Sequence, residues 1–196
     1  MEVVSGDSEN DAIHILQSFR QRPALYIGEK SLERLGEFIS GYEFARLIHP
    51  IKDPPLFHIP HEFFTWVDYR LGYYGSTSGW VEKIRERSAN EGEAWDRFWM
   101  YYDEFHDRQK YVVAQLLGYE RRIHFSPGPK GEDYVEKVNS PLSLYAHPES
   151  KGIYREGEHK TGVFHRIEDL ETTLSISRDD LVLLDQTWNY GIQSER

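Results

Sequence analysis

The stretch Arg22-Pro-Ala-Leu-Tyr-Ile-Gly28 and the segment of residues 31–48 that follows it decide the fold of this chain. Pro23 fixes its own φ and biases Arg22 away from the α region, so a helix that arrives from the N-terminal side is predicted to end here. The apolar run at residues 25–27 is predicted to be a buried, extended segment. Gly28 permits a positive-φ turn, after which Ser31 is predicted to cap the next helix. The stretch is therefore predicted to join two helices.

Apolar residues recur at three-and-four spacing in several segments, which predicts amphipathic helices. The stripes are Ala12, Ile15, Leu16 and Phe19; Leu35, Phe38, Ile39, Tyr42 and Ala45; Phe63, Phe64, Trp66 and Val67 within residues 61–71; and Ala94, Trp95, Phe98, Tyr102 and Phe105. Asn90 and Glu93 form a candidate capping box for the last of these helices. A shorter helix with Trp80, Val81 and Ile84 is predicted to be capped by Ser78.

Beyond Gly118 the pattern changes to short β-like segments, at residues 123–125, 142–146 and 163–167. Ser177 is predicted to cap a last helix that has Leu181, Leu184 and Trp188 on one side. The sequence thus predicts an α+β fold, with a mainly helical N-terminal two-thirds and a small antiparallel β-containing C-terminal part. The predicted domains are a disordered tail at residues 1–10, a helical domain at 11–118, and a β-containing subdomain at 119–196, which has a C-terminal helix and is packed on the helical domain.

Composition narrows the functional classes. The chain has 196 residues, a formal net charge of -10 and no cysteine. Clustered Lys and Arg are needed to neutralise phosphates, so the charge argues against nucleic-acid and anionic-membrane partners. The charge is compatible with a basic protein partner, but solubility is the more common reason for an acidic chain. Missing cysteine excludes disulfides, thiolate catalysis and Cys-ligated metals. Residues 1–10 lack the basic start and apolar core of a signal peptide, so we expect a cytoplasmic protein.

Several tempting active sites fail on their own spacing. His58 and His61 are three residues apart, but Thr65 stands where a second zinc-binding His of His-Glu-x-x-His is needed. Residues 75–79 place Thr77 at the nucleophile position of Gly-x-Ser-x-Gly, and residues 128–131 lack the Gly-Lys-Ser or Gly-Lys-Thr of a P-loop. We therefore predict no catalytic residue, no metal and no cofactor. The carboxylates of Asp103, Glu104 and Asp107 are interpreted as an exposed helix face.

The residues Arg22, Pro23, Tyr26, Ile27 and Gly28 resemble a segment in the ATPase domain of type II topoisomerases and their relatives. That family carries a catalytic Glu and, four residues later, an Asn on the following helix. Here Glu33 is followed at this spacing by Glu37, and Glu37 by Gly41. The adenine-binding Asp-x-Gly-x-Gly segment is also missing, so nucleotide hydrolysis is not the favoured interpretation.

A second resemblance extends over residues 20–105. Its structural motif consists of Arg22, Pro23, Tyr26, Gly28, Ser31, Trp66 and Trp80, together with Gly41-Tyr42 and Tyr69-Arg70-Leu71-Gly72. These motifs resemble a family of small, largely uncharacterised bacterial proteins, similar to the immunity proteins of polymorphic toxin systems. The resemblance implies a non-catalytic protein that binds and neutralises a cognate toxin domain.

Aromatic residues make up 14% of the chain, and neighbours such as Tyr101 and Tyr102 cannot all face one core because adjacent helical residues point about 100° apart. Exposed aromatics among carboxylates suit a basic partner. The predicted partner-binding residues are Tyr73, Tyr74, Glu91, Glu93, Tyr101, Asp103 and Glu104. Two alternatives stay open: an enzyme that uses Arg22, Tyr26 and C-terminal histidines on a small phosphorylated or nucleotide-like substrate, and a dimeric regulatory or scaffold module.

Overall fold

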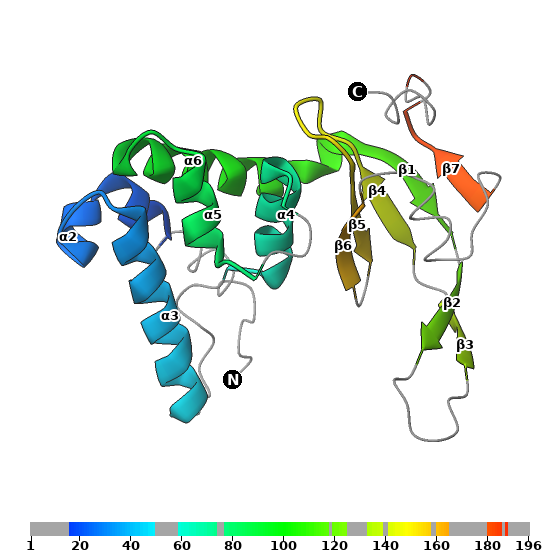
Figure 1. Ribbon diagram of the computed structural model, residues 1–196, viewed down its shortest axis with the longest axis horizontal. Helices are drawn as coiled ribbons and strands as arrows, with labels where there is room; N and C mark the ends of the chain where they lie inside the picture. Colours follow the sequence, from blue (N-terminus) through cyan, green and yellow to red (C-terminus); the bar gives the residue numbers. More distant parts are fainter. Residues whose placement is uncertain are drawn as a thin grey trace, which may run out of the picture. The chain divides into compact units, whose positions relative to one another are not determined.

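A computed structural model of the chain describes residues 16–49, 59–73, 77–117, 119–124, 133–138, 141–157, 160–164, 180–185 and 187. The α+β prediction is confirmed, with helices in the N-terminal part and an antiparallel sheet in the C-terminal part (Figure 1). The chain divides into unit 1, residues 1–63 and 78–103, and unit 2, residues 64–77 and 104–196. This division passes within two helices and differs from the predicted boundary at residue 118.

Some predictions lie outside the described residues. They concern the tail at 1–10, Ala12, Ile15, His58, Tyr74, Ser177, Trp188 and the turns at 75–76 and 126–131. Residues 16–21, which contain the predicted positions Leu16 and Phe19, are helical, and both side chains are buried. The helix ends before Pro23, as predicted.

The later helices match the sequence closely. Their bounds are α2 Pro23–Ile27, α3 Leu32–Ile48, α4 His61–Leu71, α5 Trp80–Glu86 and α6 Glu91–His106, followed by the 3-10 turn η1 Arg108–Tyr111. The Asn90 side chain accepts a hydrogen bond from the Glu93 amide at 3.0 Å, which confirms half of the capping box. The Glu93 carboxylate accepts from the Ala89 amide at 2.6 Å instead of from the amide of Asn90. The prediction that Ser78 caps α5 is wrong, because the N-cap of this helix is Gly79.

The junction itself was predicted incorrectly in one respect. Residues 25–27 belong to α2 and are not extended, and only Ile27 is buried, whereas Leu25 and Tyr26 are 69% and 43% exposed. The physical reason is that Pro23 occupies the first turn of a helix, where its fixed φ is favourable and its missing N–H costs nothing. Gly28 ends α2 with a φ of 85°, and the Ser31 side chain caps α3 by accepting from the Arg34 amide at 3.3 Å; both were predicted.

The core of unit 1 forms around α6. Phe98 is fully buried and makes aromatic contacts with Phe63, Trp80 and Trp99, at ring-centroid distances of 5.6, 5.2 and 4.9 Å. Helix α3 packs on α5 through Gly36, where an added Cβ would lie 2.5 Å from Cγ2 of Val81. The close approach of the two helices therefore depends on a glycine.

Unit 2 contains a five-stranded antiparallel sheet of order β6-β5-β4-β1-β7 and a separate hairpin of β2 and β3. The bounds are β1 Val112–Leu116, β2 Tyr119–His124, β3 Asp133–Val138, β4 Leu142–Tyr145, β5 Ile153–Gly157, β6 Lys160–Phe164 and β7 Leu181–Leu183. Leu116 pairs with Leu142 on one side and with Leu181 on the other, and all three are in the core. The predicted last helix is wrong at residues 181–183, which form β7.

Trp66, at the centre of a second aromatic cluster, is fully buried in unit 2. Its ring centroid lies 5.3 Å from that of Tyr69, 6.3 Å from Tyr145 and 5.2 Å from Tyr154. These contacts join the C-terminal part of α4 to β4 and β5, so residues 64–71 belong with the sheet. Within the described residues, no helix is long and apolar enough to span a bilayer.

Candidate partner-binding site

Unit 1 has an open groove of about 680 Å³ where α2 joins α3. It is lined by the end of α2, the connection to α3 and the first turns of α3, namely Tyr26, Ile27, Glu29, Ser31, Glu33, Arg34, Glu37 and Phe38. The groove is thus formed where residues 22–28 join the helix that starts after Ser31. The positive-φ turn at Gly28 and the cap at Ser31 set the path of the chain between α2 and α3.

One wall of the groove is aromatic. The Phe19 ring is buried and stacks on Tyr26, with ring centroids 4.5 Å apart and an interplanar angle of 24°. It also contacts the Phe38 ring at 4.9 Å. Phe38 was predicted to face the core, but it is 39% exposed. The buried Phe19 ring contacts both Tyr26 and Phe38 and limits their motion. These two aromatic side chains should therefore lose little conformational entropy when a partner binds in the groove.

The rest of the lining is mostly acidic. Glu29 forms an ion pair with Arg34 at 2.8 Å, and Glu33 lies 3.5 Å from Arg85. Glu37, one turn after Glu33, is exposed and makes no hydrogen bond or ion pair within the described part of the chain. Three carboxylates and one guanidinium give this lining a net negative charge. A cationic group could pair with Glu37 while lying near the aromatic wall.

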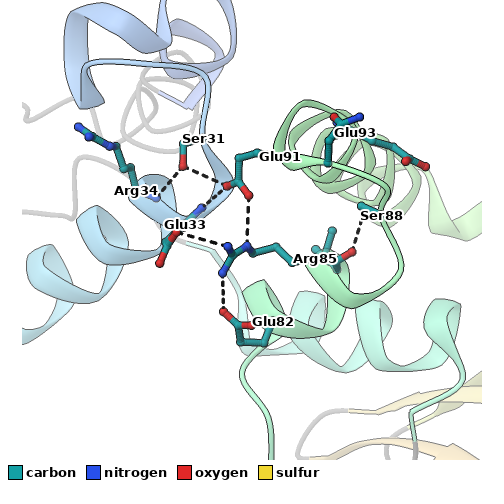
Figure 2. Close-up of polar contacts among 10 residues, drawn as sticks. Ser31, Glu33, Arg34, Glu82, Arg85, Ser88, Glu91 and Glu93 are labelled. Atoms are coloured by element: carbon teal, nitrogen blue, oxygen red, sulfur yellow. Dashed lines mark hydrogen bonds and ion pairs between the residues drawn. The ribbon is translucent and has the colours of Figure 1, made fainter.

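The Glu91 carboxylate, at the start of α6, is hydrogen-bonded to two of the groove-lining residues, Ser31 and Glu33 (Figure 2). Its Oε1 accepts hydrogen bonds from the Ser31 hydroxyl at 3.0 Å and from the Glu33 amide at 2.9 Å. The Ser31 hydroxyl also accepts from the Arg34 amide, and its residue is only 6% exposed. One carboxylate therefore satisfies two donors at the N-terminus of α3, where an anion is electrostatically favoured.

Arg85 of α5 completes this network. Its guanidinium donates to the other oxygen of Glu91 at 3.2 Å and to Glu82 at 2.9 Å. Burial opposes ionisation of Glu91, but the hydrogen bonds from the Glu33 amide and the Ser31 hydroxyl and the charge of Arg85 outweigh it, so the pKa of Glu91 is below its ordinary value. The ionised carboxylate consequently braces α3 against α5 and α6.

Two of the predicted partner-binding residues on α6 are used within the fold. Glu93 accepts from the Ala89 amide and from Arg97, at 2.9 Å and 2.8 Å to the two guanidinium nitrogens. Tyr101 is 3% exposed, so the prediction that it lies on the surface is wrong. The physical reason is that a broad face of α6 is covered, so adjacent positions such as Tyr101 and Tyr102 are both buried.

Asp103 remains at the surface, where it forms a bidentate ion pair with Arg20 at 2.9 Å for each oxygen. Glu91 is hydrogen-bonded to the groove residues Ser31 and Glu33, but Glu91, Glu93 and Asp103 are not themselves among the groove-lining residues. Glu104 and the half-buried Tyr73 belong to unit 2.

Glu104 takes part in a polar cluster inside unit 2. It accepts from Arg70 at 2.7 Å, and the same guanidinium donates to Ser150 at 2.8 Å and to Glu149 at 2.9 Å. The Arg70 side chain is only 3% exposed. Buried guanidinium groups need such partners, so this cluster is interpreted as a brace between α4, α6 and the turn after β4.

His147 adjoins the brace. Its Nδ1 accepts from the Glu149 amide at 3.1 Å, so this nitrogen carries no proton, and Nε2 lies 3.8 Å from Glu104. Burial and the nearby Arg70 guanidinium lower the pKa of His147 below its ordinary value, against the opposing charges of Glu104 and Glu149. His147 is thus held neutral by its surroundings, which suits a structural role.

The enzyme alternative names Arg22 and Tyr26, which the structure places differently with respect to the groove. Arg22 is exposed and is not among the residues that line the groove, although Tyr26 is. No group of three or more His, Asp or Glu side chains in the described ranges is arranged to hold a metal ion. The groove instead offers carboxylates, aromatic rings and a capped helix start, which together favour recognition of a cationic surface.

Sequence reasoning did not place Glu29, Glu33, Glu37 and Phe38 at a groove. Glu33 and Glu37 were considered only as candidate ATPase acids, and Phe38 was assigned to the buried stripe. A usable signal exists, because Glu33 and Glu37 are four residues apart on the side of α3 that faces away from Leu35 and Ile39. Their exposure follows from that geometry.

Comparison of the chain with family models, with curated proteins and with solved structures finds no match in any of the three. The groove's own residues therefore carry the functional proposal.

Proposed function

We propose that this chain is a non-catalytic immunity-type protein of the cytoplasm that binds a cognate toxin domain and neutralises it. The neutralising role rests on the resemblance of residues 20–105 to immunity proteins. The binding role rests on one observation, the open groove of unit 1 with its exposed carboxylates and its braced aromatic wall.

The groove suits a basic protein surface in both charge and shape. Glu37 is unpaired among the described residues, so an incoming Lys or Arg would not have to displace an existing partner. Tyr26 and Phe38 are already ordered by Phe19, so little side-chain entropy is lost on binding. The chain's net charge of -10 would speed encounter with a cationic partner.

Neutralisation would follow from occupancy. A toxin domain that acts on a polyanion needs exposed Lys and Arg side chains, and a carboxylate-lined groove competes for those side chains. No chemical step by this chain is needed. Binding should therefore weaken as ionic strength rises, because exposed ion pairs are screened within about 10 Å at 0.1 M salt.

The test is co-purification with the product of the adjacent gene, followed by titration calorimetry of the purified pair. The double variant Glu33→Gln and Glu37→Gln should lower affinity by about tenfold or more, since it removes two of the three carboxylates that line the groove. Glu43→Gln is the matched control, because Glu43 is an exposed acid on another face of α3 and should leave affinity unchanged.

Expression of the wild-type chain should also protect growing cells from the partner, and the double variant should protect them less. If the purified pair fails to associate, the immunity proposal is lost. If the pair associates but the double variant binds as tightly as the wild type, the binding surface lies elsewhere and the groove assignment is wrong.

A further inference from the structure

Helix α3, Leu32–Ile48, continues for several turns beyond Phe38, the last of the groove-lining residues (Figure 1). Glu33, Glu37, Gly41, Phe44 and Ile48 follow one another at spacings of three or four residues, so they lie along one side of the helix. That side faces away from the buried residues Leu32, Leu35 and Ile39. The row extends over about 22 Å at the rise of an α-helix.

The second half of this row is apolar and exposed. Phe44 and Ile48 of the row are 62% and 53% exposed, and Leu47, which lies beside them on the helix, is 78% exposed. None of the three has an aromatic or polar interaction among the described residues. Exposed apolar side chains that adjoin one another on a helix mark interaction sites more often than isolated ones do.

The first half of the row is acidic, and Gly41 separates the two halves. A Cβ added at Gly41 would meet nothing within 4 Å, so the surface there is open and a partner backbone could approach closely. Glu33 and Glu37 lie on the acidic side of Gly41, and Phe44 and Ile48 lie on the apolar side. The face is therefore polarised along its length.

We infer that this outward face of α3 binds an amphipathic, positively charged helical segment of the partner, with the segment's Lys or Arg residues over Glu33 and Glu37 and its apolar residues over Phe44 and Ile48. The inference rests on the proposed function and specifies the chemistry of the toxin surface. Charge complementarity selects this occupant, because an acidic half beside an apolar half matches a helix whose basic and apolar residues are segregated.

The segment is expected to run antiparallel to α3. Lys and Arg are favoured at the C-terminal end of a helix by its dipole, and in the antiparallel orientation that end meets Glu33 and Glu37 at the start of α3. A second copy of the chain fits less well, because two such faces in antiparallel contact would place carboxylates against Phe44 and Ile48.

The test uses two fluorescent synthetic peptides of about 16 residues. The ordered peptide forms a helix with Leu at the N-terminal positions and Lys at the C-terminal positions of one face. The second peptide has the same composition in scrambled order. Fluorescence anisotropy with the full chain at about 0.15 M salt should give at least about tenfold tighter binding for the ordered peptide. The double variant Phe44→Ser and Ile48→Ser should lose this preference. The Glu33→Gln and Glu37→Gln variant should bind more weakly and with less dependence on salt.

The matched control is Leu25→Ser with Met100→Ser, which removes two exposed apolar side chains elsewhere in unit 1 and should bind as the wild type does. The inference is overturned if both peptides bind equally, or if Phe44→Ser with Ile48→Ser leaves binding intact. It is also overturned if sedimentation shows a wild-type dimer that this variant converts to a monomer, because a second copy then occupies the face.

Failure of this inference and failure of the proposed function can be told apart. A toxin domain that binds wild type and the Phe44→Ser, Ile48→Ser variant equally well would overturn the α3 inference and leave the immunity proposal standing. Specific binding of the ordered peptide, with no association between the chain and the adjacent gene product, would overturn the immunity proposal instead.

Discussion

Helices α3 and α6 carry similar residues but bury them to different extents. On α6, Trp95, Phe98 and Trp99 are at most 2% exposed, whereas Phe44 and Leu47 on α3 are 62% and 78% exposed. Three-and-four spacing of apolar residues indicates a helix in both segments. It indicates a core only where another element covers the stripe, and coverage is a property of the tertiary structure.

The carboxylates of the two helices differ in the same way. On α6, Glu91 accepts hydrogen bonds from the Ser31 hydroxyl and the Glu33 amide, and Asp103 pairs with Arg20. On α3, Glu37 is exposed and unpaired among the described residues. A carboxylate that the fold already uses has little capacity for a partner, so the unpaired acid is the better candidate for binding.

The largest expected effect is the difference in stability between a Phe→Ala substitution on α6 and one on α3. Phe98→Ala should lower the free energy of unfolding by about 3–5 kcal/mol, because it empties a packed site, whereas Phe44→Ala should change it by less than about 0.5 kcal/mol. Urea unfolding followed by far-UV circular dichroism measures both. A similar loss for Phe44→Ala would mean that the end of α3 is covered in solution, and the docking face would be lost.

Glu91→Gln should have the next largest effect, about 1–2 kcal/mol, because it weakens the bonds to Ser31, the Glu33 amide and Arg85 in a partly exposed site. The effect should depend on pH. The folded-state pKa of Glu91 is lowered from 4.5, so its stabilisation is fully present above pH 4.5 and is lost as pH falls through the folded-state pKa.

The stability difference between wild type and Glu91→Gln should therefore be constant near neutral pH and shrink below pH 4.5. Urea unfolding at a series of pH values measures it. Glu43→Gln serves as the control, because this exposed carboxylate lies outside the network and should leave the stability curve unchanged. A difference that does not shrink in acid would show that Glu91 braces α3 through packing and not through its charge.

Substitution of two glycines of α3 by Ala should change stability by smaller amounts and in opposite directions. Gly36→Ala should destabilise by about 1 kcal/mol, because the new Cβ would lie 2.5 Å from Val81 and the overlap exceeds the gain in helix propensity. Gly41→Ala should stabilise by about 0.5–1 kcal/mol, because nothing lies within 4 Å. Thermal unfolding of both variants tests which side of α3 is packed.

A second substitution at the contact sharpens the result. Val81→Ala in the Gly36→Ala background removes the overlapping methyl group and should recover part of the lost stability. If Gly36→Ala is instead as stabilising as Gly41→Ala, α3 and α5 are not in close contact in solution. The side of α3 at Gly36 would then be no more packed than the side at Gly41.

Local chemistry made much of the helical part predictable. The Ser31 cap, the positive φ of Gly28 and the Asn90 bond to the Glu93 amide each depend on residues within three or four positions of one another. The bounds of α4 agree with the predicted range of 61–71 for the same reason, since proline-rich and glycine-rich flanks limit the helix.

Non-local pairing made the rest unpredictable. Residues 181–183 form a strand because Leu181 pairs with Leu116, which is far away in the sequence. Short apolar runs such as 25–27 do not distinguish helix from strand by periodicity. Likewise, the exposure of Phe38 and Glu37 depends on which elements cover α3, so the groove could be proposed only from the three-dimensional arrangement.

The smallest effect tests the acids of the two helices directly. Asp103→Asn should lower stability by less than about 1 kcal/mol, because both side chains of the pair with Arg20 are largely exposed. Glu37→Gln should be neutral or slightly stabilising, because it removes an unpaired charge from an acidic groove. Added salt should reduce the first effect, since screening weakens the ion pair in wild type. Urea unfolding at low and high salt measures both variants. If Glu37→Gln lowers the free energy of unfolding more than Asp103→Asn does, Glu37 has a partner within the chain and is not a candidate for binding another protein.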